Sequence, residues 1–180
     1  MQTQWISLLM VLMTVSTLRA QTDLVMRNQI KLTSAGAKRV LEAAKQRAAA
    51  LSISENIAVV DEGGYLLAFE RMQGARPASV ATAITKAVTA AAMRKESGPV
   101  FDGKSQRGEA FNLAIEHAAA AGGAKITILY GGIPIIVDGQ LVGAIGVGGG
   151  SEEQDVSVGR AGASALQAAL ASMQGRAERE

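Results

Sequence analysis

The 180-residue sequence has no cysteine, a single histidine and three prolines, and aromatic residues make up only 3% of it. The absence of cysteine excludes disulfide bonds, thiolate metal sites and a cysteine nucleophile. Because His117 is the only histidine, a zinc site built on a pair of histidines is excluded as well. The sequence also lacks a nucleophile-elbow motif. Few of the common catalytic arrangements remain.

The sequence also has little excess of positive over negative charge. The formal net charge is +2, and the basic residues form no cluster along the chain, so we expect no nucleic-acid partner. Hydrophobic residues at 48% and charged residues at 19% are typical of a globular chain that buries a core. Alanine and glycine take the place of aromatic residues, which favours close packing of small side chains. The length fits one domain.

The amino-terminal segment differs from the rest of the chain. An uncharged apolar run, WISLLMVLMTVSTL, extends from Trp5 to Leu18 and is followed by Arg19 and Ala20. Such a run is short for a membrane span and typical of the core of a signal peptide. We therefore predict a signal peptide over residues 1–20 and a periplasmic or secreted protein that has no membrane attachment after cleavage. An uncleaved anchor is the alternative.

Four segments carry apolar residues at spacings of three and four, the pattern of amphipathic helices. Thr33 and Ser34 precede the first, and both residue types favour a helix N-terminus. The second is rich in alanine, which lets a helix approach its neighbour closely. The predicted helices cover about residues 33–51, 78–93, 109–121 and 152–173, and a charged tail, 174–180, follows.

Five short apolar runs, separated by glycine-containing links, have the character of β-strands. Asp138–Gly139 between two of them is a strong hairpin signal. Strands grouped in hairpins indicate an α+β domain with an antiparallel five-stranded sheet flanked by helices, in the order α-β-β-α-α-β-β-β-α. We expect one domain over residues 30–173. The predicted strands are 57–60, 65–69, 126–129, 133–137 and 141–147.

Five motifs follow one another along the chain: VDEGG at 60–64, KAVTA at 86–90, GGIPI at 131–135, VGAIGV at 142–147 and EQD at 153–155. With these motifs in this order, the sequence resembles the GlcG/HbpS-like family over residues 32–170. The resemblance implies an antiparallel sheet flanked by helices, akin to profilin-like or PAS-like domains. Because the family includes exported haem-binding proteins that form homo-oligomers, it also implies a small-molecule ligand, haem or a similar tetrapyrrole, and a homo-oligomer.

Glycine occupies alternate positions at the end of the last predicted strand. Alternate residues of a strand point to the same face, and Gly146 and Gly148 leave one face bare. A bare face accommodates either a closely packed helix or a flat ligand, and both alternatives stay open. Gly132, Gly146 and Gly148 are the candidate contacts of a bound cofactor.

Three cations surround the link between the second strand and the second helix. Arg71, Arg76 and Lys86 are candidate partners for the two propionates of a haem, since carboxylates pair well with guanidinium and ammonium groups. A solvated loop is the alternative for Arg76. For Lys86, the alanines around it favour an approach of its ammonium group to the sheet. His117 is a candidate iron ligand, against the alternative of a solvent-facing histidine. Further candidates, each against the alternative of an ordinary core or surface residue, are Tyr65, Met72, Met93 and Tyr130.

An enzyme is the alternative to a binding protein. Lys86 together with Glu153 or Asp155 has the composition of an acid–base pair that acts on a small organic acid or aldehyde. The other explanation for Glu153 and Asp155 is stabilisation of a helix N-terminus, where acidic residues are favourable. The sequence does not decide between these alternatives.

Overall fold

The computed structural model describes residues 28–102, 105–177 and 179. The predicted signal peptide, residues 1–20, lies outside them. The described residues from Lys31 onward form one compact unit. No helix in the described part of the chain combines the length and the hydropathy that a membrane span requires.

The first helix and the first hairpin form where the sequence predicts them. Helix α2 (Ser34–Ala50) begins after Thr33, whose Oγ1 accepts a hydrogen bond from the backbone N–H of Gly36 at 3.1 Å. Strands β1 (Asn56–Asp61) and β2 (Leu66–Arg71) pair in antiparallel fashion. The Asp61 carboxylate accepts hydrogen bonds from two backbone N–H groups of the connecting turn, which fixes the hairpin.

Strands β5 (Gly132–Val137) and β6 (Gln140–Gly148) form the second hairpin. The sheet has the order β2-β1-β6-β5, with every pair antiparallel. The amino-terminal and carboxyl-terminal hairpins thus meet at the β1–β6 pair, which places the end of β6 beside the start of β1.

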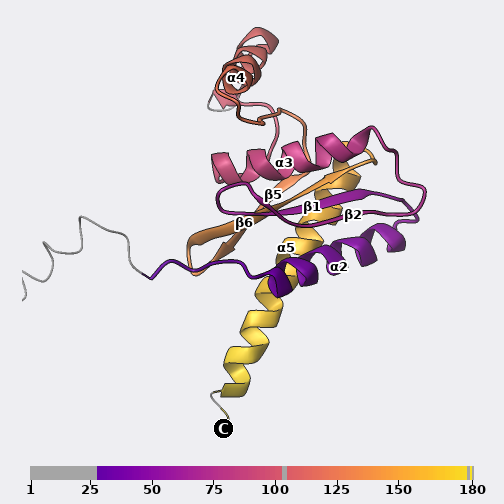
Figure 1. Ribbon diagram of the computed structural model, residues 1–180, viewed down its shortest axis with the longest axis vertical. Helices are drawn as coiled ribbons and strands as arrows, with labels where there is room; N and C mark the ends of the chain where they lie inside the picture. Colours follow the sequence, from indigo (N-terminus) through magenta and orange to yellow (C-terminus); the bar gives the residue numbers. More distant parts are fainter. Residues whose placement is uncertain (1–27, 103–104, 178, 180) are drawn as a thin grey trace, which may run out of the picture. The chain divides into compact units, whose positions relative to one another are not determined.

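Helices cover both faces of the sheet (Figure 1). Helix α3 (Ser79–Met93) lies on one face, and α2 and α5 (Glu152–Ala177) lie on the other. The alanines of α3 pack on small residues of the sheet: the core on this face consists of Ala58, Val60, Ala83, Ala87, Ala90, Ala91 and Ala144. The close packing that the composition predicts is therefore present.

The sheet has four strands, so the prediction of five strands and of their order is wrong. Residues 126–129 form no strand because side chains bind their backbone groups. The N–H of Thr127 donates to Thr89 Oγ1 at 2.9 Å, and the N–H of Ile128 donates to Glu116 Oε1 at 3.0 Å. The carbonyl of Leu129 accepts from Ser97 Oγ at 2.7 Å.

Two further elements lie between α3 and β5. Strands β3 (Phe101–Asp102) and β4 (Ser105–Gln106) form a two-stranded ribbon in a segment for which no strand was predicted. Helix α4 (Glu109–Ala121) follows and matches its predicted bounds. At the other end of the chain, α5 continues to Ala177, four residues beyond the predicted end.

Candidate functional site

A pocket of about 340 Å³ lies where the loop after β6 meets the first half of α3 and the start of α5. Polar side chains from both helices and the backbone of the loop form its wall. The lining residues are Arg76, Ala78, Ser79, Thr82, Lys86, Leu129, Tyr130, Gly149, Gly150, Glu152 and Asp155.

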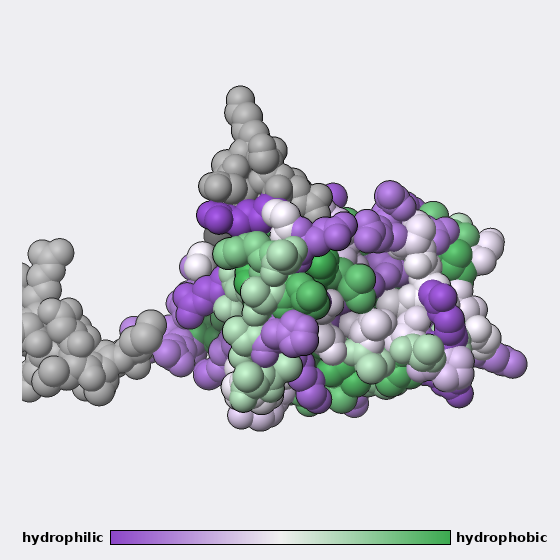
Figure 2. Space-filling model, turned by 90° about the horizontal axis from the view of Figure 1, so that it is seen from above, coloured by the Kyte–Doolittle hydropathy of each residue, from purple (hydrophilic) through white to green (hydrophobic). Residues whose placement is uncertain are grey.

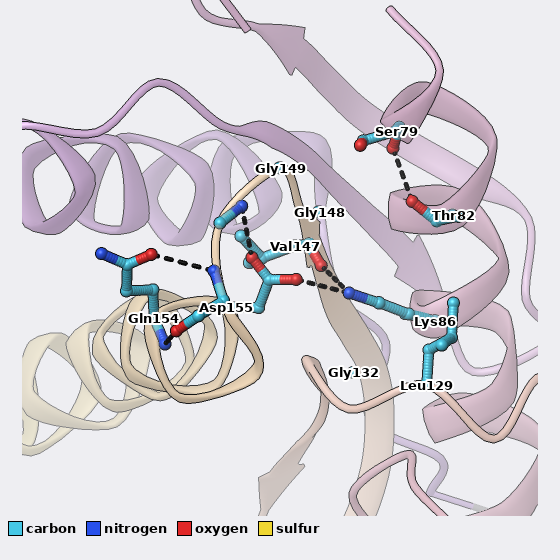
Figure 3. A network of polar contacts seen from close by, with 12 residues as sticks. Ser79, Thr82, Lys86, Leu129, Gly132, Val147, Gly148, Gly149, Gln154 and Asp155 are labelled. Carbon is cyan, nitrogen blue, oxygen red and sulfur yellow. Dashed lines mark hydrogen bonds and ion pairs between the residues drawn. The ribbon is translucent and has the colours of Figure 1, made fainter. Parts of the chain in front are cut away.

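The wall of this pocket contains a buried ion pair. Lys86 Nζ lies 2.5 Å from Asp155 Oδ2, and only 5% of Lys86 and 3% of Asp155 is exposed. The same ammonium group donates to the carbonyl of Val147 at 2.9 Å. Figure 3 shows the Lys86 side chain extending from α3 to the end of β6, where it meets Asp155.

Local sequence explains how α3 and α5 bring these two charges together. Ala83, Ala87 and Ala90 are fully buried around Lys86, so the helix lies close enough to the sheet for the lysine to reach β6. Asp155 is in the first turn of α5, and its Oδ1 accepts a hydrogen bond from the N–H of Gly150 at 3.1 Å. The carboxylate thus ties the loop after β6 to the helix.

Burial shifts the proton affinity of this carboxyl group. The pKa of Asp155 is raised because burial disfavours the charged form, and the hydrogen bond from Lys86 offsets part of that effect. Removing one partner of such a pair leaves an uncompensated charge, at a cost of about 3–5 kcal/mol. The pair is therefore a fixed part of the pocket wall.

Glu55, directly before β1, is a site residue that sequence analysis misses. It is 0% exposed, and neither carboxylate oxygen has a hydrogen-bond partner among the described residues. Burial, followed by the nearby Asp155 charge, raises its pKa to about 7. A glutamate between Ser54 and Asn56 resembles an exposed loop residue, so the sequence gives no signal of this burial.

The loop after β6 passes close to this carboxylate at two glycines. A Cβ atom at Gly149 would collide with Glu55 Oε2, and one at Gly150 would collide with Glu55 Oε1. Gly149 also has φ +146°, in the region that favours glycine. The glycines therefore let the pocket wall pass directly over the buried acid.

The comparisons with known proteins agree with this architecture. The model of a family described as haem degrading protein HbpS-like matches residues 32–164, which is most of the chain. The chain belongs to the HbpS-like family.

Individual relatives support this assignment. Protein GlcG of Escherichia coli K12 is 34% identical over 122 residues, which cover 68% of this chain and 84% of GlcG. The crystal structure of HbpS superimposes with a TM-score of 0.64 at 28% identity, covering 78% of this chain and 94% of that one. A PduOC–haem complex has the same fold, with a TM-score of 0.61, 24% identity and coverage of 76% and 95%.

In this HbpS-like chain, one of the two predicted arginines reaches the pocket. Arg76 lines it and donates from Nη2 to the carbonyl of Gly149 at 2.9 Å. Asn56 links the backbone at Arg76 to the end of β6, since its Nδ2 donates hydrogen bonds to the carbonyls of Arg76 and Gly148. Arg71 is exposed at the end of β2 and lines neither described pocket.

The predicted glycine face lies under helix α3. A Cβ atom at Gly146 would collide with the backbone of Ala83 and Ala87, and one at Gly132 would collide with the carbonyl of Lys86. At Gly148, a Cβ atom would lie 2.9 Å from Thr82 Oγ1. Of the two alternatives for these glycines, the structure displays close packing of a helix. The pocket lies next to them in the sequence, at Gly149 and Gly150 after the end of β6.

Glu153 and His117 lie apart from Lys86. Glu153 accepts a hydrogen bond from Ser151 Oγ at 2.8 Å, which lowers its pKa, and it lines a second pocket of about 410 Å³ together with Tyr130 and Glu152. His117 is exposed on α4. Among the described residues, no cluster of His, Asp and Glu has the composition of a metal site.

Proposed function

We propose that this protein binds a flat, carboxylate-bearing ligand, haem or a similar tetrapyrrole, in the pocket over Gly149 and Gly150. The observation that carries the proposal is the combination of an exposed guanidinium, Arg76, with a rigid wall formed by the buried Lys86–Asp155 pair. Membership of the HbpS-like family and the shared fold of a PduOC–haem complex support the choice of ligand.

The residues present fit a haem. The guanidinium of Arg76 is a suitable partner for a propionate, and Leu129 offers apolar surface to the macrocycle. The phenol oxygen of Tyr130 is of a type that ligates haem iron. The first pocket alone is near the lower limit of small-molecule sites, but it shares Tyr130 and Glu152 with the second pocket, so a larger flat ligand has room to extend across both.

Backbone packing holds Tyr130 in place at this shared wall. A Cβ atom at Gly98 would lie 2.5 Å from Tyr130 Cε1, so the absence of a side chain at Gly98 makes room for the ring. A bound haem would supply an iron centre, and Tyr130 would orient it while Arg76 neutralises a propionate.

Titration of the purified protein with hemin tests the proposal. We expect a saturable shift of the Soret band, and a loss of affinity of about ten- to a hundredfold in Arg76→Ala because one charge-assisted contact of about 1.5–3 kcal/mol is removed. Arg71→Ala is the matched control, since Arg71 is exposed outside the pocket and its removal should leave the affinity unchanged. An unsaturable titration, or equal losses in the two variants, would contradict the proposal.

Two further properties belong to the same proposal: export and self-association. The apolar run at residues 5–18 supports export to the periplasm or beyond, with cleavage near Ala20. Cell fractionation and amino-terminal sequencing of the recovered protein test this. The exposed apolar residues of the domain support a homo-oligomer, which light scattering on the mature protein tests.

Acid–base catalysis on a small organic acid or aldehyde is a second candidate, because Lys86 and Asp155 lie in hydrogen-bond contact at the pocket wall. Asp155 is a better candidate than Glu153, because Glu153 accepts a hydrogen bond from Ser151 and not from Lys86. A double variant, Lys86→Met with Asp155→Asn, removes the pair without leaving a buried charge. Loss of turnover with retained hemin binding would favour the enzyme, and retained turnover would eliminate it.

A further inference from the structure

Glu55 is a buried acid that the proposed ligand contacts leave unused. Charged residues ordinarily lie at the surface of a folded protein, and Figure 2 shows hydrophilic residues spread over one face of the domain. Glu55, in contrast, is 0% exposed, and neither of its carboxylate oxygens has a hydrogen-bond partner among the described residues. Gly149 and Gly150, which line the pocket, pass directly against this carboxyl group. An ionised group in such a place is costly unless a nearby charge compensates it.

Charged groups from three segments of the described chain act on Glu55. Asp155 of α5 opposes its ionisation, whereas Lys86 of α3 and Arg76, which precedes α3, favour it. The neighbours from the loop after β6 and from the end of β2 are uncharged: Gly149, Gly150 and Met72. The charge state of Glu55 therefore depends on what happens to these three charges.

The charge of Arg76 is used differently from that of Lys86. Lys86 is committed to Asp155 in the buried ion pair, whereas Arg76 donates to an uncharged partner, the carbonyl of Gly149, and lines the pocket. A ligand carboxylate that pairs with Arg76 neutralises a positive charge that favours ionised Glu55, and it adds a negative charge across the loop. Both effects favour the neutral form of Glu55.

We propose that the pocket takes up its anionic ligand together with a proton, which Glu55 receives behind the Gly149–Gly150 loop. The proton comes from solvent and adds to a carboxylate oxygen of Glu55, and no other bond forms or breaks. Because the coupling between two sites is reciprocal, protonation of Glu55 must also raise the affinity of the pocket for the anion.

The direction of the pH dependence follows from the ligand-free protein. Burial, followed by the Asp155 charge, raises the pKa of Glu55 to about 7. Below this value Glu55 already holds its proton, so the affinity does not depend on its titration. Above it, binding must recruit a proton, so the affinity falls as the pH rises, until the pH passes the still higher pKa of Glu55 in the ligand-bound state.

Hemin titrations at a series of pH values test this inference, which rests on the proposed ligand pocket. Glu55→Gln cannot titrate, while hemin and every other titratable group are the same as in the unaltered mature protein, so the ratio of the two affinities isolates Glu55. Between about pH 6.5 and about pH 9, the unaltered protein should lose affinity relative to Glu55→Gln by about fivefold or more. Arg71→Ala, outside the pocket, is the matched control and should keep the full pH dependence. Saturable binding with the same pH profile in Glu55→Gln and the unaltered protein would overturn the inference and leave the haem proposal standing.

A measurement without ligand separates the two proposals. In protein with isotopically labelled glutamate carboxyl groups, NMR follows Glu55 as the carboxyl whose titration midpoint lies near 7. Arg76→Ala imitates the neutralisation of Arg76 by a ligand, so this midpoint should rise by about half a pH unit or more, whereas Arg71→Ala should leave it in place. An unchanged midpoint in Arg76→Ala would overturn the inference whether or not hemin binds. A raised midpoint in a protein that does not bind hemin would refute the haem proposal alone.

Discussion

The buried charge cluster and the exposed helix α4 depart from the ordinary distribution of residues in opposite directions. Lys86, Asp155 and Glu55 are charged types that are almost never fully buried without partners, and here at most 5% of each is exposed. Phe111 and Leu113 are apolar and exposed. The difference teaches that topology decides burial here: the charged residues lie where α3, β6 and α5 pack together, whereas no described helix or strand packs extensively on α4.

The contrast is sharper because the two helices involved are so similar in sequence. Helix α3 and helix α4 are both short and rich in alanine, yet α3 buries seven of its residues and α4 buries one. Composition therefore does not separate a core helix from an exposed one. The separation comes from topology, because α3 lies on β1 and β6 whereas α4 follows the β3–β4 ribbon away from the sheet.

The largest expected change in the free energy of unfolding comes from breaking the Lys86–Asp155 ion pair. Lys86→Met leaves the Asp155 carboxylate buried without a counter-charge, so the free energy of unfolding should fall by about 3–5 kcal/mol. Urea denaturation of the mature protein measures this. The double variant, Lys86→Met with Asp155→Leu, is the control and should recover most of the loss; a loss in the single variant of well under 1 kcal/mol would show that the pair is not buried in solution.

The titration of Glu55 is expected to change the free energy of unfolding by a somewhat smaller amount. Its pKa is raised from 4.5 to about 7 in the folded protein, so the folded state holds a proton that the unfolded chain releases between these values. The free energy of unfolding should therefore fall as the pH rises from about 4.5 to about 7, by about 3 kcal/mol, and change little from this group above pH 7.

Urea denaturation at a series of pH values tests this linkage. Glu55→Gln cannot titrate, so its stability should depend less on pH than that of the unaltered chain over the same range. Since Asp155 also has a raised pKa, some slope should remain in the variant. Identical slopes in the two proteins would mean that Glu55 has an ordinary pKa.

The smallest effect on the folded monomer is expected in α4. Leu113→Ala should change the free energy of unfolding by less than about 0.5 kcal/mol when measured below the concentration of self-association, because the side chain is already exposed. Leu166→Ala is the matched substitution at a buried leucine of α5, where the expected loss is about 2–5 kcal/mol. Equal losses would show that α4 packs on its own domain.

The sequence predicts most of the fold because hydrophobic periodicity and glycine turns are local signals. The α4 bounds and the Asp138–Gly139 hairpin follow from them directly. Residues 126–129 have the composition of a strand, but Thr89, Ser97 and Glu116 bind their backbone groups. These partners come from two distant segments, which no local pattern reveals.

The site is predicted less completely than the fold. Lys86, Asp155 and Arg76 are recognised as candidates from residue type and family resemblance, and the pocket brings all three together. Which acid pairs with Lys86 depends on the orientation of one helical turn, which places Asp155 inward and Glu153 outward. Glu55 is missed because its burial results from the β1–β6 pairing and the loop beyond it.

A crystal of the mature protein soaked with hemin, examined for anomalous scattering at the iron edge, tests the central claim most directly. The account predicts one strong iron peak per chain in the pocket, within bonding distance of the Tyr130 phenol oxygen and with electron density for a propionate at Arg76. An iron peak bound to His117 on α4, with the pocket free of density for the macrocycle, would contradict it.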